Sequence, residues 1–260
     1  MNKEIKRHIE ETLAKGMRFD GRKADEYRPI SVQVGVTKNA EGSARVKIGE
    51  TDVIVGVKMA VEKPYPDTPE DGTFAVNVEL LPLSNPEFET GPPGIQAIEL
   101  ARVVDRGVRE SKAVDTKALC IEKAEKAWCI MVDICPINDA GNLFDASSLA
   151  TILALQDTRF PAFDGIEIDY KTRTEKKIPL HLIPVAVTVY KIGKHLLVDP
   201  TIEEDQVSDA RLTVCATEDG HICALQKGGN TPLTLSDIEA MIDYALGQIK
   251  VLRHNIGVKK

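Results

Sequence analysis

The sequence SARVKIGETDVIVGVKM, residues 43–59, predicts two strands joined by a tight turn at Ile48-Gly49-Glu50. A similar pattern returns later in the chain, where residues 189–198 read VYKIGKHLLV. Each stretch is a strand, a turn with the letters KIG, and a second strand. By itself this recurrence is only weak evidence for a duplicated architecture, in which each of two related halves would contain one strand–turn–strand unit.

Strand and helix signals extend outward from these two units. Further strands are predicted over residues 30–36, 73–82, 118–122, 127–135, 183–190, 211–217 and 221–226. Helices are predicted over residues 3–15, 95–111, 146–156 and 236–256, the last with a capping box formed by Ser236 and Glu239. Residues 160–179 are mostly polar and are interpreted as a connector or an exposed hairpin. Strands in antiparallel-looking pairs, followed by helices, are typical of the α+β class rather than of a doubly wound parallel sheet.

The chain divides into three predicted parts. Residues 1–28 form an N-terminal helix and arm, residues 29–160 a first domain, and residues 161–260 a second domain. A chain of 260 residues is long enough for one large domain or two small ones.

Composition excludes several classes of protein. Hydrophobic residues are 43% and charged residues 28% of the chain, which is ordinary for a folded soluble protein and not for a disordered one. The formal net charge of −7 argues against a surface that is basic throughout, although it leaves room for a local basic patch. No apolar run approaches the length of a membrane span. The charged N-terminus does not read as a secretory signal, so a cytoplasmic location is expected.

The sequence carries no recognisable site for a metal ion or a cofactor, and none is expected. The five cysteines form no CxxC pair, and the five histidines are scattered along the chain. The P-loop, GxGxxG, HExxH and GxSxG motifs are all missing. The common nucleotide-binding and hydrolase families therefore lose their usual support.

The strongest positive feature is the predicted helix that contains ELARVVDRGVRESK. Arg102, Arg106 and Arg109 share one face, because they are spaced i, i+4 and i+7, and they form a stripe about 10 Å long. Such a stripe can follow a phosphate backbone, since the guanidinium fork suits phosphate. Three acidic residues lie three or four positions from these arginines: Glu99, Asp105 and Glu110. Spacing alone therefore favours a solvated salt-bridge network over phosphate binding.

Two acidic segments are weaker candidates. The run VDPTIEEDQVSDAR, residues 198–211, clusters five carboxylates that could hold Mg²⁺ or act in acid–base chemistry, but an acidic surface turn is the favoured interpretation: Asp199, Glu203, Glu204, Asp205 and Asp209. The loop NDAGNLFD, residues 138–145, precedes a predicted helix, and helix N-termini bind anions well. This loop has no arginine or lysine, and Asp145 is interpreted as the N-cap that occupies the site itself. Phosphate binding is therefore not expected there.

Taken together and in this order, these features resemble the RNase PH family over residues 18–255. The arm Arg18-Phe19-Asp20-Gly21-Arg22 resembles the family's RxDGR arm, and the arginine helix, the DxG loop and the DPTxEE segment follow as they do in the family. Four further stretches resemble the non-catalytic RNase PH-like subunit of the archaeal exosome: PYPDTPEDG (64–72), VNVELLPL (76–83), GPPG (91–94) and IELARVVDR (98–106). The resemblance implies an RNase PH-like fold with two related halves of sheet and helix.

The resemblance also implies partners. In that family, three copies of the non-catalytic subunit alternate with three catalytic paralogues in a hexameric ring, a trimer of heterodimers that degrades RNA from its 3′ end with phosphate. RNA and RNA-binding cap subunits are the other partners that it implies. The non-catalytic subunit lends arginines of this helix to the partner's active site. The matching positions here are Arg102 and Arg106, with Arg109 as a further candidate.

No catalytic role is carried over to this chain. Active members hold the attacking phosphate with a hydroxyl and a guanidinium in the loop before the helix, whereas Gly141 is followed here by Asn142-Leu143-Phe144, and Asp145 would repel phosphate. We therefore expect a non-catalytic subunit that structures the partner's active site and binds the RNA backbone. The alternative is a self-sufficient phosphate-dependent 3′→5′ exoribonuclease that uses Asp205 and Asp209.

Overall fold

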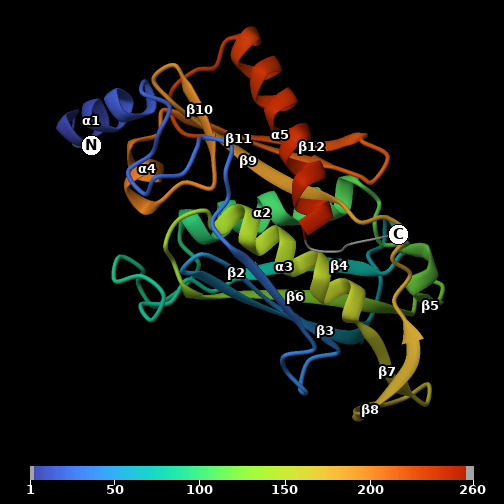
Figure 1. Cartoon of the computed structure of the whole chain (residues 1–260). Coiled ribbons are helices and arrows are strands. Elements are labelled where there is room, and N and C mark those ends of the chain that lie inside the picture. The colour runs from blue at the N-terminus through green and yellow to red at the C-terminus, as the bar shows by residue number, and fades with distance from the viewer. Residues whose placement is uncertain (1–2, 256–260) are drawn as a thin grey trace.

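The computed structural model describes residues 3–255 and contains two large sheets (Figure 1). The first has the strand order β1 (Ile30–Val34), β2 (Gly42–Ile48), β3 (Thr51–Glu62), β6 (Lys126–Asn138) and β4 (Thr73–Val78), with β5 (Cys120–Glu122) paired to β6. Neighbouring strands are antiparallel except β4, which runs parallel to β6. The second has the order β10 (His195–Val198), β9 (Val185–Ile192), β11 (Ala210–Ala216) and β12 (Ile222–Gly228), all antiparallel.

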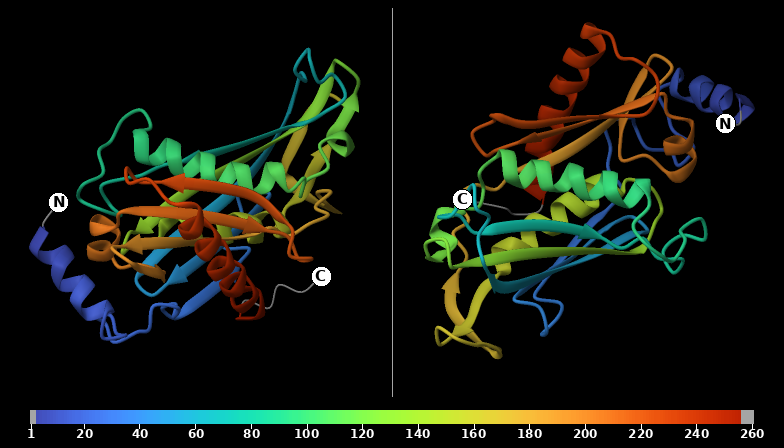
Figure 2. Two further views of the ribbon diagram at one scale, coloured as in Figure 1. Left: turned by 90° about the horizontal axis from the view of Figure 1, so that it is seen from above. Right: turned by 180° about the vertical axis from the view of Figure 1, so that it is seen from behind.

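The helices separate and cover these sheets (Figure 1, Figure 2). They are α1 (Lys3–Leu13), α2 (Ile95–Glu110), α3 (Leu143–Asp157), α4 (Ile202–Val207) and α5 (Leu235–Asn255), with a 3₁₀ turn at Lys117–Leu119. α2 and α3 lie between the two sheets, and α5 covers the outer face of the second sheet. This arrangement confirms the predicted α+β class. None of the helices within residues 3–255 has the length and apolar character that crossing a membrane requires.

Both KIG units form the predicted hairpins. Gly49 joins β2 to β3 and Gly193 joins β9 to β10, and both glycines adopt the left-handed conformation with φ 58°. Only glycine reaches this conformation without a steric cost, which explains why the same letters return at the same place in each hairpin.

The position of α3 explains why few of its residues are exposed to solvent. Its residues are buried around almost the whole circumference, because α3 packs against β2 and β3 on one side and against β9 on the other. A helix that is apolar on all sides is typical of such a central layer. α5 is different, since only one face of it is buried against the second sheet, through Met241, Ala245, Ile249 and Leu252.

Three local predictions are wrong. α3 begins at Leu143, and its N-cap is Asn142 with φ 61°, so Asp145 lies in the first turn and is not the N-cap. α5 begins at Leu235, where Thr234 and Asp237 exchange the capping hydrogen bonds in place of the predicted Ser236–Glu239 box. The acidic run after β10 is not a surface turn. It forms α4, whose capping box joins Thr201 and Glu204.

The polar segment after α3 forms the exposed hairpin that was one of its two interpretations. Strands β7 (Arg159–Phe163) and β8 (Ile168–Lys177) pair with each other and extend away from the body of the molecule (Figure 1). Phe160 at the base of the hairpin is buried in the core of the first sheet. The division of the chain at residues 28 and 160 stays a prediction, and Ile256, the last residue of the predicted final helix, lies outside the described residues.

Candidate nucleic-acid interface

Helix α2 presents the predicted arginine stripe on its exposed face. The helix follows Pro92-Pro93-Gly94, and Gly94 is its extended N-cap. Its buried face consists of residues spaced three and four apart, which pack against β4 and α3: Ala97, Leu100, Val104 and Val108. Arg102, Arg106 and Arg109 therefore point away from the core and are all exposed.

The three arginines differ in the hydrogen bonds and ion pairs that they make within the chain. Arg109 donates two hydrogen bonds to Asp105, at 2.9 and 2.7 Å, and a third to the carbonyl of Phe74 at 2.7 Å. Arg106 has a single long contact of 3.4 Å to Glu110. Arg102 has no hydrogen bond or ion pair within residues 3–255. Of the three, Arg102 is thus the most available to an external phosphate and Arg109 the least.

Glu99 does not take part in a network along α2. Its carboxylate pairs across the layer with Arg211 of β11, at 2.5 Å, so it is not engaged with Arg102, three residues further on. The salt-bridge network predicted from spacing therefore exists only in the second half of the helix, at the Arg106–Glu110 and Arg109–Asp105 pairs.

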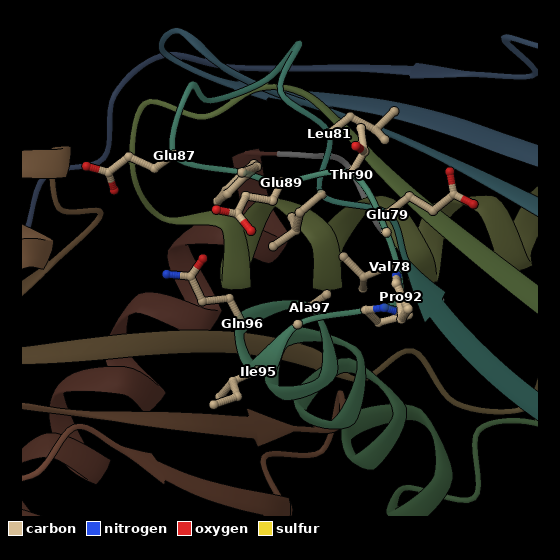
Figure 3. Close-up of a pocket in the computed structure, with 15 residues that line it drawn as sticks. Val78, Glu79, Leu81, Glu87, Glu89, Thr90, Pro92, Ile95, Gln96 and Ala97 are labelled. Atoms are coloured by element: carbon tan, nitrogen blue, oxygen red, sulfur yellow. The ribbon is translucent and has the colours of Figure 1, made fainter.

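The pocket at the start of α2 is acidic rather than basic (Figure 3). It is lined by the end of β4, by the loop that follows and by the first turn of α2. Its charged side chains are Glu79, Glu87 and Glu89, and no lysine or arginine of the part of the chain that the structure describes lines it. Carboxylates repel phosphate, so the surface of α2 that suits a nucleic acid begins beyond this pocket, at Arg102.

A buried ion-pair cluster joins the N-terminal arm to the segment after β10. Asp199 is completely buried, with φ 48°, and accepts hydrogen bonds from Arg22, Arg28 and Asn142. Arg28 also donates to the carbonyls of Ala140 and Gly141, which belong to the loop before α3. Asp199 therefore connects three segments that are distant in sequence.

A second buried pair lies beside the first. The Arg18 guanidinium contacts both carboxylate oxygens of Glu204 and donates to the carbonyls of Val198 and Asp199. The matched RxDGR and DPTxEE motifs thus bind each other. Charged residues of both motifs form ion pairs within the fold. The sequence alone could not distinguish this structural role from a role in catalysis.

The loop before α3 has carboxylates where a phosphate site would need cations. Asp145 is buried in the first turn of α3 and accepts hydrogen bonds from the Tyr27 hydroxyl at 2.6 Å and from the Thr188 amide at 2.8 Å. Burial raises its pKa to about 7, against the hydrogen bonds from Tyr27 and Thr188, which lower it. The same burial raises the pKa of Tyr27 well above its usual value.

Asp145 should make the protein less stable as the pH rises. Between about pH 4 and pH 7 the folded chain keeps a proton that the unfolded chain has released, so the free energy of unfolding falls by up to about 1.4 kcal/mol per pH unit. We expect Asp145→Asn to flatten this dependence, which thermal unfolding at pH 5, 6, 7 and 8 would measure. A variant with the same slope as the wild type would contradict the buried-carboxyl account.

The structure does not bring Asp205 and Asp209 to one site. Asp209 pairs with Lys6 of α1 and accepts a hydrogen bond from the Gly193 amide at 2.7 Å. Burial raises the pKa of Asp205 to about 6, and the nearby Arg211 opposes that shift. Within residues 3–255, no group of three or more histidine, cysteine or acidic side chains is arranged to hold a metal ion.

The sequence did not single out Arg211, whose side chain contacts both α2 and α3. Its guanidinium pairs with Glu99 of α2 and stacks 4.4 Å from the ring centre of Phe144 in α3. The two pairings link residues that are 112 and 67 positions apart, so no periodicity or local motif signals them. The only local signal was an arginine at the end of an acidic run.

Comparison with protein families identifies two matching models. Residues 26–161 match domain 1 of the 3′ exoribonuclease family, and residues 183–248 match domain 2 of the same family. A protein of Methanopyrus kandleri named exosome complex component Rrp42 is 46% identical over 257 residues, covering 97% of this chain and 96% of that protein. A protein of the same name from Archaeoglobus fulgidus is 46% identical over 253 residues, covering 96% and 95%.

Two of the solved structures that the chain resembles also come from archaeal exosomes. The chain resembles one from the Archaeoglobus fulgidus exosome with RNA bound to the active site, with a TM-score of 0.90, 44% identity and 97% of each chain covered. It also resembles a chain of an archaeal exosome core, with a TM-score of 0.85, 40% identity, and 96% and 95% of the two chains covered. The motifs, the two-sheet fold and these likenesses agree, and the chain belongs to the 3′ exoribonuclease family, the RNase PH family that its sequence resembles.

Proposed function

We propose that this chain is a non-catalytic subunit of an exosome ring that degrades RNA from the 3′ end by phosphorolysis. In the proposed ring it pairs with a catalytic RNase PH-like paralogue, and three such heterodimers close a hexamer that also binds RNA-binding cap subunits. The chain shapes the partner's active site and contacts the RNA backbone through Arg102 and Arg106. Its location in the cytoplasm stays a prediction of the sequence.

One observation supports a non-catalytic role above all others. The start of α3, where a phosphate would bind at a helix N-terminus, carries the buried carboxylate of Asp145 in its first turn, and Asn142 before it donates a hydrogen bond to the buried Asp199. The guanidiniums of Arg22 and Arg28 are paired with Asp199 and are not free for an external anion. Phosphorolysis requires a phosphate ion that is held and oriented next to the RNA, and residues 138–145 include no lysine or arginine that could hold it.

The RNA-binding role is supported by the exposed face of α2. Arg102 is unpaired within the described residues, and Arg106 has only its long contact to Glu110. Phosphate contacts of this kind position a strand without reading its bases, so the sequence preference of the bound RNA should be weak. Arg109 remains a candidate, although its bonds to Asp105 and to Phe74 would have to break first.

A degradation assay tests the proposal directly. The full chain alone, incubated with single-stranded RNA, inorganic phosphate and Mg²⁺, should release no nucleoside diphosphate, whereas the chain assembled with its catalytic paralogue should release it processively from the 3′ end. Nucleoside diphosphate production by the chain alone, lost in Asp205→Asn, would establish the alternative of a self-sufficient exoribonuclease. Co-purification of the paralogue with the tagged chain would identify the partner used in the assay.

A further inference from the structure

We propose that the groove between α2 and the β11–β12 hairpin binds a segment of the RNA phosphodiester backbone, and that the Arg211–Glu99 ion pair sets the charge of this groove. It is lined by Glu99 and Arg102 from α2, by Arg211 from β11, and by Asn230 from the loop after β12. The inference rests on the proposed function, since RNA is the ligand. It extends the proposed RNA contact from α2 to residues of β11, β12 and the loop after β12.

The groove contains one carboxylate, and Arg211 neutralises it. Among residues 3–255, Glu99 is the only acidic residue that lines the groove, and its Oε1 atom lies 2.5 Å from the Arg211 guanidinium. Arg102 lines the same groove three positions after Glu99, a spacing at which a free glutamate would pair with it. Because Glu99 is bound to Arg211 instead, Arg102 is left as an uncompensated cation that faces the groove.

Arg211 is fixed in this role by its surroundings. Its side chain is only 15% exposed, and its guanidinium stacks on Phe144. On the other side it lies directly against Gly228, where the Cβ of any other residue would be 2.4 Å from the guanidinium carbon. Arg211 and Gly228 are opposite each other in the β11–β12 ladder. The glycine thus provides the space that the guanidinium fills, and Arg211 acts as a positioning residue for Glu99.

The remaining walls suit a nucleic-acid strand. Asn230 is exposed, and its side chain makes no hydrogen bond within residues 3–255, so its amide can donate to a phosphate oxygen. Ile95 and Ile98 of α2 line the groove and are 85% and 49% exposed, which offers an apolar surface for a ribose or a base. Arg102 and Lys227 as cations, a free amide and an apolar wall match the alternating chemistry of an RNA strand better than that of a free phosphate ion.

Two single substitutions in the ion pair test the inference, because they should act in opposite directions. Glu99→Gln removes the negative charge of the carboxylate that lines the groove, so the assembled ring should bind RNA about three- to tenfold more tightly. The plot of log affinity against log salt should steepen by about 0.7, the value for one additional phosphate contact with a single strand. Arg211→Met leaves Glu99 free to pair with Arg102, so affinity should fall about three- to tenfold and the slope should become shallower by about 0.7.

The measurement uses the ring assembled with a catalytically inactivated partner and a fluorescent oligoadenylate, so that bound RNA is not degraded. The exposed Glu70–Lys123 pair, 2.6 Å apart and outside the groove, gives matched controls with the same charge changes, Glu70→Gln and Lys123→Met. The controls should leave affinity and slope unchanged. Thermal unfolding of each ring identifies a variant that fails to fold, and Glu99→Gln, which keeps the shape of the side chain, is the decisive one.

The outcomes separate this inference from the proposed function. If both variants of the ion pair weaken binding, or if Glu99→Gln leaves affinity and slope unchanged, the pair is only structural and the groove does not bind RNA. Inorganic phosphate could displace RNA more strongly than another salt does at the same ionic strength. If it does, and if Glu99→Gln strengthens this competition, the ligand is free phosphate and the RNA assignment is overturned. The proposed function itself is tested by the degradation assay with the chain alone and assembled, which is a separate experiment that leaves the Glu99–Arg211 pair intact.

Discussion

Reversing the charges of Arg102 and Arg106 together should weaken RNA binding by the assembled ring at least about 100-fold. A hydrogen bond to a charged group contributes about 1.5–3 kcal/mol, and Arg102→Glu plus Arg106→Glu removes two such contacts and adds repulsion. Losing two phosphate contacts should also reduce the slope of log affinity against log salt by about 1.4. Fluorescence anisotropy with a single-stranded oligoadenylate, at several salt concentrations and with an inactivated partner, measures both quantities.

The fold should survive this change. Both side chains are exposed, Arg102 has no partner within the described residues, and Arg106 has one weak contact. A matched control reverses Lys171 and Lys177 on the exposed hairpin strand β8, which changes the net charge by the same amount. Only the α2 variant should lose RNA. An unchanged affinity in a ring that still assembles would place the RNA on another surface and would remove the role proposed for this chain.

The same helix illustrates how far the sequence can predict a binding site. The spacing of Arg102, Arg106 and Arg109 on one exposed face was predicted correctly, because helical periodicity depends only on local geometry. Which of them is free was not predictable. Arg109 donates a hydrogen bond to the carbonyl of Phe74 on β4, and Arg102 is unpaired within residues 3–255 because Glu99 binds Arg211. Such pairings depend on how the layers pack, and no local pattern encodes them.

For the fold too, elements that depend on neighbouring residues could be predicted, whereas pairings between distant residues could not. The KIG hairpins at Gly49 and Gly193 follow from turn chemistry, and most strands and helices follow from hydrophobic patterning. The parallel pairing of β4 with β6, across α2 and β5, leaves no trace in the sequence of either strand. The acidic run was misread because a cluster of carboxylates is usually solvated, whereas Asp199 and Glu204 are buried here by arginines from the N-terminal arm.

Replacing Asp199 by asparagine should lower the free energy of unfolding by about 3–5 kcal/mol, the cost of breaking a buried ion pair by removing one partner. Asparagine has the same shape and tolerates the left-handed φ of 48°, so the effect is one of charge. Without the carboxylate, the Arg28 guanidinium keeps its charge at 13% exposure with no acidic partner within residues 3–255, while Arg22, at 10% exposure, keeps only its pair with Asp20. Urea unfolding of the full chain should measure the loss, together with a fall in Tm on the order of 10 °C.

A second aspartate–arginine pair supplies the control. Asp52 pairs with Arg45 at 2.6 Å on the first sheet, but Arg45 is 32% exposed and water can solvate it when the carboxylate is gone. Asp52→Asn should therefore cost about 1 kcal/mol or less. Salt should reduce the small loss at Asp52 and leave the large loss at Asp199 unchanged, because buried charges are screened weakly. Equal losses in the two variants would mean that the arm is held by its packing and not by Asp199. The matched RxDGR and DPTxEE motifs would then need another explanation than the ion pairs that join them.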